Sequence, residues 1–288
     1  MVRPALPPHW MTAKSFSKHW ITILMLNNIQ IRNFSTRPTV RSGLSLLELL
    51  VVLTILIALG GIVVSTLPGM LKRTQVATAA SNIPEIDATV RRTSMLSQGK
   101  IGNRFDALVA GSDSLDGNIP SYIGGAEAFE TTNLSVADVG ALREIGITEL
   151  VPAAAATINA TYNSHDQTPV EIGSDSNVCS LSVDSAMTIL PHDWNLEPAE
   201  NAKYIVVGLG EQCSMVGAGQ QAAFSESPVH FSDSREQSPD EMYSRYLLLV
   251  EIRSVDELKS VARYVGAAIP GQNGIHSVSR ELEEYYTN

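Results

Sequence analysis

The sequence predicts an α+β protein in which a long amino-terminal helix is followed by a mixed globular head. Residues 49–71 carry no charge and are mostly Leu, Ile, Val and Ala, and residues 72–98 continue with apolar side chains at roughly helical spacing. Farther along, residues 204–209 and 246–252 are short apolar runs of the kind that form buried strands. One long helix and a later sheet indicate this fold class.

The first apolar run is long enough to cross a bilayer. As a helix its 23 residues would rise about 34 Å, against about 30 Å of hydrocarbon. Gly60, Gly61 and Pro68 interrupt the run, but membrane helices tolerate such residues where neighbouring helices repack around them. Six Lys and Arg residues precede Glu48 and no acidic residue does. This asymmetry predicts a cytoplasmic amino end and a head on the far side of the membrane.

Glu48 is the only ionisable residue between Arg41 and Lys72. A carboxylate inside hydrocarbon costs at least about 2.5 kcal/mol, so it marks a functional site unless it stays hydrated at the interface. A secretory signal peptide would have a shorter apolar core with small residues after it, whereas Ser42 and Gly43 come before it here. A plain signal anchor would explain the topology but not Glu48.

The segment from Gly43 to Val52, which reads GLSLLELLVV, resembles the cleavage and methylation signal of type IV prepilins and type II secretion pseudopilins. The resemblance implies that a prepilin peptidase cuts between Gly43 and Leu44 and that the new amino group of Leu44 is methylated. It also implies that Glu48 guides assembly, and that the head is pilin-like with an antiparallel sheet. Leu44 stands where the family usually has Phe or Met.

Elementary electrostatics gives this motif a physical reason. Cleavage would create a positively charged amino group at Leu44. Glu48 of a neighbouring subunit could pair with that group only in one stagger of the two helices, and an unpaired carboxylate would penalise every other register.

The expected organisation is a removed leader (1–43), a transmembrane and assembly helix (44–71), its continuation (72–98) and a globular head (99–288). Met11 and Met25 are alternative starts of the long leader. After the cut, the chain would contain 14 Lys and Arg residues and 30 Asp and Glu residues, which gives a formal net charge of −16. That charge argues against nucleic-acid binding, which needs a basic surface.

Within the head, the composition of residues 111–122 predicts a loop, and residues 135–145 a short helix. Residues 159–185 suggest loops and short strands. Ser254 with Glu257 forms a capping-box pattern for a helix to about Tyr264, and residues 279–286 suggest a last helix. Pro84 is expected to kink or break the long helix.

Several residue groups raise other hypotheses. Cys179 and Cys213 would form a disulfide outside the cytoplasm, with two separate buried thiols as the alternative. Asp113, Asp116 and Asn118 are weak candidates for a Ca²⁺ site, with a solvated turn as the alternative, because their spacing does not match an EF loop. Gly208 and Gly210 after a strand lack the rest of a dinucleotide motif.

Residue types of a hydrolase also occur, but without a catalytic motif around them. They are His165, Asp166, His192, Asp193 and Ser214. The resemblance implies a structural subunit of a type II secretion pseudopilus or a type IV pilus, in the bacterial inner membrane, and we expect no enzymatic activity and no cofactor. Its expected partners are a prepilin peptidase, other pilin-like subunits, the inner-membrane assembly machinery and the lipid bilayer. The alternative is a membrane-anchored protein whose outer domain binds a ligand or partner independently of any filament.

Overall fold

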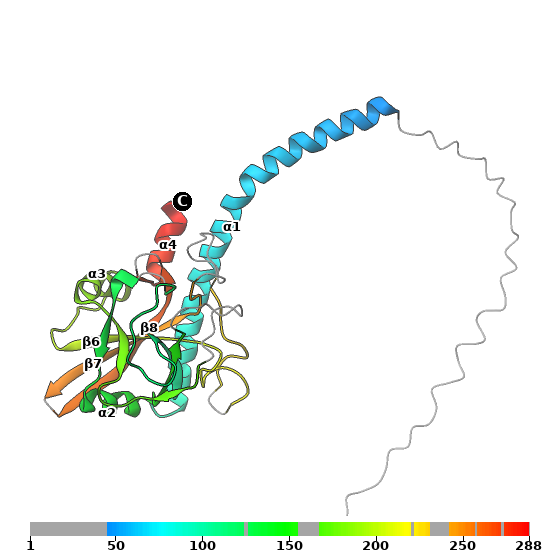
Figure 1. The fold of residues 1–288 in the computed structure, drawn as a ribbon. Helices are drawn as coiled ribbons and strands as arrows, with labels where there is room; N and C mark the ends of the chain where they lie inside the picture. The colour runs from blue at the N-terminus through cyan, green and yellow to red at the C-terminus, as the bar shows by residue number, and fades with distance from the viewer. Residues whose placement is uncertain are drawn as a thin grey trace, which may run out of the picture. The chain divides into compact units, whose positions relative to one another are not determined.

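The computed structural model describes residues 45–123, 126–154, 167–219, 222–230, 242–256, 258–271 and 274–287. Figure 1 shows the fold. The elements in chain order are α1 (Leu46–Leu96), β1 (Arg104–Ala110), η1 (Ala126–Ala128), β2 (Phe129–Asn133), α2 (Val136–Glu144), β3 (Glu149–Ala153), β4 (Val170–Glu171), β5 (Asn177–Leu181), α3 (Val183–Trp194), β6 (Ala202–Gly208), β7 (Leu247–Asp256), β8 (Lys259–Gly271), β9 (Gly274–His276) and α4 (Val278–Thr287). The chain divides inside α1 into two units, Met1–Leu56 and Ile57–Asn288.

The described strands form one sheet, which confirms the α+β class with an apolar amino-terminal helix and a sheet-rich head. Its main order is β4-β3-β1-β6-β7-β8-β9, and β2 joins through β5. The predicted antiparallel sheet is wrong, because β1 and β3 pair in parallel and the sheet is mixed. A parallel pair needs a crossover connection, and here the chain between the two strands supplies β2 and α2.

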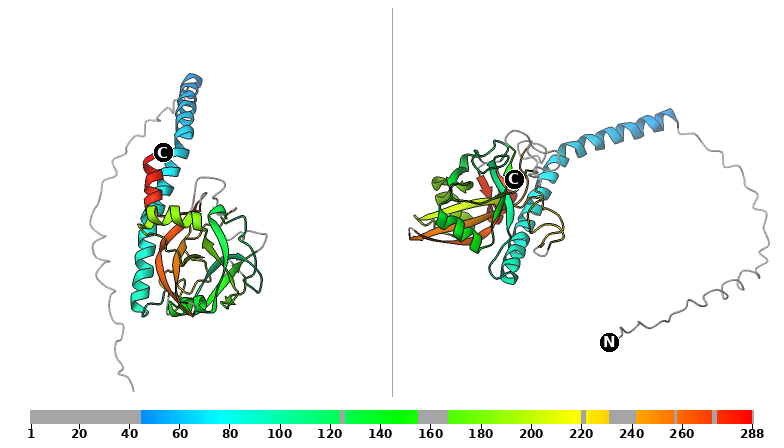
Figure 2. Two further views of the ribbon diagram at one scale, coloured as in Figure 1. Left: turned by 90° about the vertical axis from the view of Figure 1, so that its left-hand side faces the viewer. Right: turned by 60° about the horizontal axis from the view of Figure 1, so that its bottom comes forward.

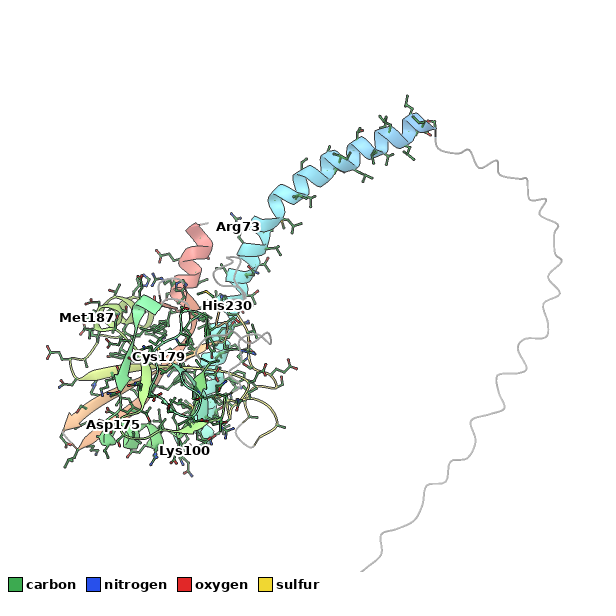
Figure 3. All side chains as sticks on the ribbon, in the orientation of Figure 1. Arg73, Lys100, Asp175, Cys179, Met187 and His230 are labelled. Atoms are coloured by element: carbon green, nitrogen blue, oxygen red, sulfur yellow. The ribbon has the colours of Figure 1, made fainter. Side chains whose placement is uncertain are left out.

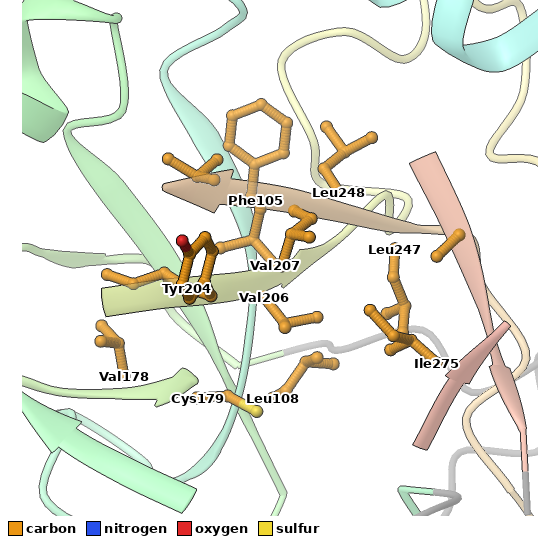
Figure 4. Packing of buried hydrophobic residues seen from close by; sticks show 14 of the residues in the cluster. Phe105, Leu108, Val178, Cys179, Tyr204, Val206, Val207, Leu247, Leu248 and Ile275 are labelled. Carbon is orange, nitrogen blue, oxygen red and sulfur yellow. The ribbon is translucent and has the colours of Figure 1, made fainter. Parts of the chain in front are cut away.

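Strand β6 is the centre of the head. It pairs along its length with β7. On its other side Ile205 faces Ser180 of β5, and Gly208 faces Asp106 of β1, so two branches of the sheet meet there. Apolar residues of β6 and of the first half of β7 are buried together, as the close view in Figure 4 shows. The predicted strands at 204–209 and 246–252 therefore form the core of the head.

The second half of α1 packs on the head through one stripe. Its buried members are spaced three or four residues apart: Val76, Ala79, Ala80, Ile83, Ile86 and Val90. The predicted break at Pro84 does not occur, because α1 continues to Leu96. Pro84 is exposed while Ile83 and Ile86 on either side are buried, so packing holds the helix through this position.

Two predicted helices have opposite outcomes. The helix at 135–145 is confirmed as α2, with a capping box between Ser135 and Asp138. The prediction of a helix from Ser254 to Tyr264 is wrong, because this segment forms the end of β7, the turn and the first half of β8. Asp256 closes the turn by accepting a hydrogen bond from the Leu258 amide at 3.0 Å. Strand pairing with β7 outweighs a capping signal that is purely local.

The remaining expectations are mostly met. Residues 111–122 form a loop, and the last helix is α4. Of the polar segment 159–185, residues 159–166 lie outside the described residues, and residues 167–181 contain the predicted short strands as β4 and β5. Its last residues begin α3, a helix that the polar composition did not predict.

Candidate functional site

The amino end of α1 carries the residues on which the functional prediction depends. Gly43 and Leu44 lie outside the described residues, so the description begins at Ser45. The Ser45 amide donates to Glu48 Oε2 at 2.9 Å, and the Glu48 amide donates to Ser45 Oγ at 3.2 Å. These two bonds form a capping box, which satisfies two of the free amides at the helix start.

The capping box gives Glu48 a role within its own chain. Its carboxylate lies in the first turn of α1, where the helix dipole favours a negative charge. A carboxylate can accept hydrogen bonds at both oxygens, so the bond to the Ser45 amide does not saturate it. Glu48 is therefore held at the first turn of α1 with capacity for a further hydrogen-bond or charge partner.

The helix that follows Glu48 presents apolar side chains to its surroundings. Leu46–Val64 is the one stretch among the described residues that is long and apolar enough to cross a membrane, and none of it is buried. Leu47 is 71% exposed and Val64 is 72% exposed. Figure 3 shows side chains standing out from both sides of this part of the helix. An apolar surface of this length requires lipid or other helices as its environment.

The predicted disulfide does not form in the structure, where Cys179 and Cys213 are both free and buried. Cys179 lies in β5 among the core side chains of Figure 4. Burial raises the pKa of both thiols, and that of Cys213 rises to about 12. Both sulfurs therefore stay protonated near neutral pH, and neither is an activated nucleophile.

The weak Ca²⁺ candidates lie in the loop after β1. Ser114 Oγ donates to Asp116 Oδ1 at 2.6 Å, and the Ala110 amide donates to the Asn118 carbonyl at 2.9 Å. Asp113 is exposed. Among the described residues, no group of three or more His, Cys, Asp or Glu side chains is arranged to hold a metal ion. All three candidate side chains are exposed in this loop, and its ends are joined by the Ala110–Asn118 hydrogen bond.

The structure describes three of the five hydrolase-type residues, namely His192, Asp193 and Ser214. His165 and Asp166 lie outside the described residues. His192 Nδ1 lies 2.7 Å from Asp193 Oδ1 at the end of α3. Ser214 Oγ instead accepts the amide of Asn103 at 2.9 Å, which fixes the chain before β1.

The two glycines after β6 have a packing role. A Cβ at Gly208 would lie 1.7 Å from the hydroxyl oxygen of Tyr243, and one at Gly210 would lie 2.1 Å from Asp106 Oδ2. Tyr243 donates to Asp106 at 2.8 Å, and both side chains are buried. Glycine is needed here because a buried carboxylate and a phenol lie against the backbone.

Two further buried carboxylates, those of Glu251 and Asp138, stabilise the head, and neither was predicted from the sequence. Glu251 on β7 has a side chain only 2% exposed, and it pairs with Arg253 at 2.9 Å and with Arg263. Burial opposes its ionisation, but the hydrogen bonds from Arg263 and Arg253 outweigh that effect and lower its pKa. The pairing depends on cross-strand register, which no local pattern encodes.

Asp138 in the first turn of α2 joins three elements. It accepts hydrogen bonds from Lys203 Nζ at 2.7 Å and from Ser260 Oγ at 2.9 Å. Burial opposes its ionisation, but the bonds from Lys203, Ser135 and Ser260 lower its pKa. The carboxylate thereby ties α2 to β6 and to β8.

A cavity of about 440 Å³ lies where α1 and α2 end beside β8. We call it the β8-edge groove, and its lining includes Arg91, Met95, Glu144, Ile145, Arg263 and Tyr264. The Arg91 guanidinium carbon lies 5.2 Å from the centre of the Tyr264 ring. Arg91 also donates to the carbonyl of Val265 at 2.7 Å, at the register shift where Val265 has no partner residue on β7.

Of the sequence-predicted assembly residues, Glu48 alone lies within the described part of the chain. Its capping partner Ser45 was not predicted, although Ser45 and Glu48 have the spacing of a capping box. No protein-family model, curated protein or solved structure matches this chain.

Proposed function

We propose that this chain is a structural subunit of a pilin-like filament, either a type II secretion pseudopilus or a type IV pilus. A prepilin peptidase would cut it after Gly43 and methylate Leu44. The apolar part of α1 would anchor it in the bacterial inner membrane, with the head on the outer side. There the assembly machinery would transfer it from the lipid bilayer into a bundle with other pilin-like subunits.

The observation that carries this proposal is the placement of Glu48. It is the only acidic residue at the start of a 51-residue helix, five positions after Gly43. The following apolar stretch is uncovered within the chain, whereas the later stripe from Val76 to Val90 packs on the head. Such a helix supports the head at one end and offers an apolar surface for bundling at the other.

A charge pair explains how the subunits would choose their stagger. Transfer out of water removes the hydration of the Glu48 carboxylate, and a positively charged partner offsets that free-energy cost. The amino group of Leu44 in the adjacent subunit would be such a partner. Since the carboxylate keeps its bond to the Ser45 amide, it is already oriented at the helix start, which reduces the entropy lost on pairing.

Mass spectrometry of the amino-terminal peptide, from protein purified out of its own membranes, tests the proposal. We expect a chain that begins at N-methylated Leu44. Gly43→Ala should still be processed, whereas Gly43→Trp should not, because the peptidase site must accept a small residue before the cut. An intact leader that starts at Met1, Met11 or Met25 would contradict the filament role.

The capping box favours one alternative. If its only role is to start the helix, the chain is a membrane-anchored protein whose head binds a ligand or partner without assembling. The β8-edge groove would then be the first place to search for that ligand, because its volume falls within the range of small-molecule sites. Unprocessed protein with an active, ligand-binding head would favour this alternative.

A further inference from the structure

The β8-edge groove presents cationic and apolar groups together. The side chains of Arg91 and Arg263 are 48% and 55% exposed, whereas their partners Asp87 and Glu251 are 29% and 2% exposed. Each arginine is paired with a carboxylate that is less exposed than the arginine itself. The exposed Glu144 also lines the groove, so its rim carries both signs of charge. At the rim Met95 is 81% exposed. This combination is typical of the centre of a protein interface, where Arg and Met are enriched.

Helix α4 has complementary properties. Its sequence holds three glutamates against one arginine. Tyr286 is 80% exposed and Leu282, one helical turn earlier, is 40% exposed. The Glu283 side chain, next to Leu282, is 65% exposed, and its Oε2 lies 3.9 Å from His192 Nε2 of α3. An exposed tyrosine beside an apolar and an acidic side chain matches a groove that is apolar with arginines at its edge.

The two surfaces cannot meet within one head. Helix α4 packs on its own α3 and β9. Figures 1 and 2 place it at the end of the head opposite to the carboxyl end of α1, where the groove lies. The exposed face of α4 can therefore reach this groove only in another molecule.

We propose that the β8-edge groove receives helix α4 of a second copy of this chain, with Tyr286 in the groove and Glu283 beside its arginines. Two different surfaces then meet, so each copy keeps one groove and one α4 for further copies. Contacts of this heterologous kind produce open, helical assemblies instead of closed dimers.

This inference rests on the proposed function, because helix bundling is what brings the heads close together. A groove of about 440 Å³ and one short helix form a small contact, weaker than a stable dimer requires. Once the α1 helices are bundled, however, the heads meet at a high effective concentration, and a weak contact is sufficient to fix their arrangement.

Cysteine crosslinking on the full-length chain in its own membranes tests the contact. The double variant Met95→Cys, Leu282→Cys places one thiol at the groove and one on α4. The native cysteines are buried and protonated, so a short thiol crosslinker reacts with the introduced pair. Leu258→Cys, Leu282→Cys is the matched control, because Leu258 is 91% exposed but lies in the turn between β7 and β8 and does not line the groove.

We expect a ladder of covalent oligomers whose yield exceeds that of the control by about ten-fold. Adding Tyr286→Ala should reduce the yield by about ten-fold, as loss of an aromatic anchor does. Adding Met187→Ala, which removes an exposed apolar side chain of α3, should leave the yield unchanged.

Three results would overturn the inference: equal yields from the two pairs, a product that stops at the dimer, or a crosslinked partner of another mass. The amino-terminal mass of the same sample reports processing separately. If the protein is processed and incorporated into filaments but gives no ladder, the α4 contact is refuted and the proposed function stands. If the protein is unprocessed, the proposed function is refuted, and so is the arrangement in which α4 would meet the groove.

Discussion

Replacing Glu48 by Gln separates the two roles that the structure and the motif suggest for this residue. Glutamine keeps an amide oxygen that can accept the Ser45 N–H, and it serves in capping boxes as glutamate does. It carries no charge and cannot form an ion pair with an amino group at Leu44. Alanine removes both interactions. The two variants therefore distinguish helix capping from charge pairing.

The expected magnitudes differ enough to measure. Loss of the cap costs about 1 kcal/mol, or about five-fold in an equilibrium. Loss of one partner from a desolvated ion pair costs about 3 kcal/mol, or more than about 100-fold. If charge pairing drives assembly, Glu48→Gln and Glu48→Ala should both reduce filament incorporation by about 100-fold. The additional loss of the cap should separate them by no more than about five-fold.

The assay is quantitative immunoblotting of sheared filaments against the membrane pool, with amino-terminal mass spectrometry of both fractions. Both variants should insert and be cleaved normally, because residue 48 lies beyond the cleaved bond. Incorporation of Glu48→Gln within about five-fold of the unmodified chain would refute the charge-pairing argument and leave capping as the role of Glu48.

Three further predictions concern the head of the full-length chain in detergent. The pKa of Glu251 is lowered in the folded protein, so the stability that its charge provides is complete above the ordinary value of 4.5 and is lost as pH falls through the folded pKa. Urea unfolding between about pH 3 and pH 7 should show this slope. Glu251→Gln should flatten the slope and lower the free energy of unfolding by about 2 kcal/mol at pH 7. Both cysteines should resist thiol labelling until the protein unfolds, and rapid labelling of Cys213 in the native state would contradict its burial and its pKa of about 12. Gly210→Ala should destabilise by about 2–3 kcal/mol because its Cβ would overlap Asp106, whereas Gly219→Ala, with open space around it, should change the unfolding midpoint little.

The helix signals in this chain illustrate why local patterns are only partly informative. Ser135 with Asp138 and Ser45 with Glu48 both form capping boxes. Ser254 with Glu257 has the same spacing, but Ser254 pairs with Ser260 in a hairpin. A capping box stabilises a helix by about 1 kcal/mol, which is less than a strand gains from a full row of cross-strand partners. The capping-box spacing is present in the sequence, but the pairing of the segment with other strands determines whether a helix forms there.

The sequence by itself determined the long helix, its apolar first half, the position of Glu48 and the two central strands, because each depends on a pattern within a short stretch of chain. Only the tertiary structure decided the parallel pairing of β1 with β3, the burial of Glu251 between two arginines, and the separation of Cys179 from Cys213 as free thiols. It also brought Arg91 of α1 over Tyr264 of β8 to form the groove. These features join residues far apart in the chain, and their pairing depends on register and packing that no local pattern specifies.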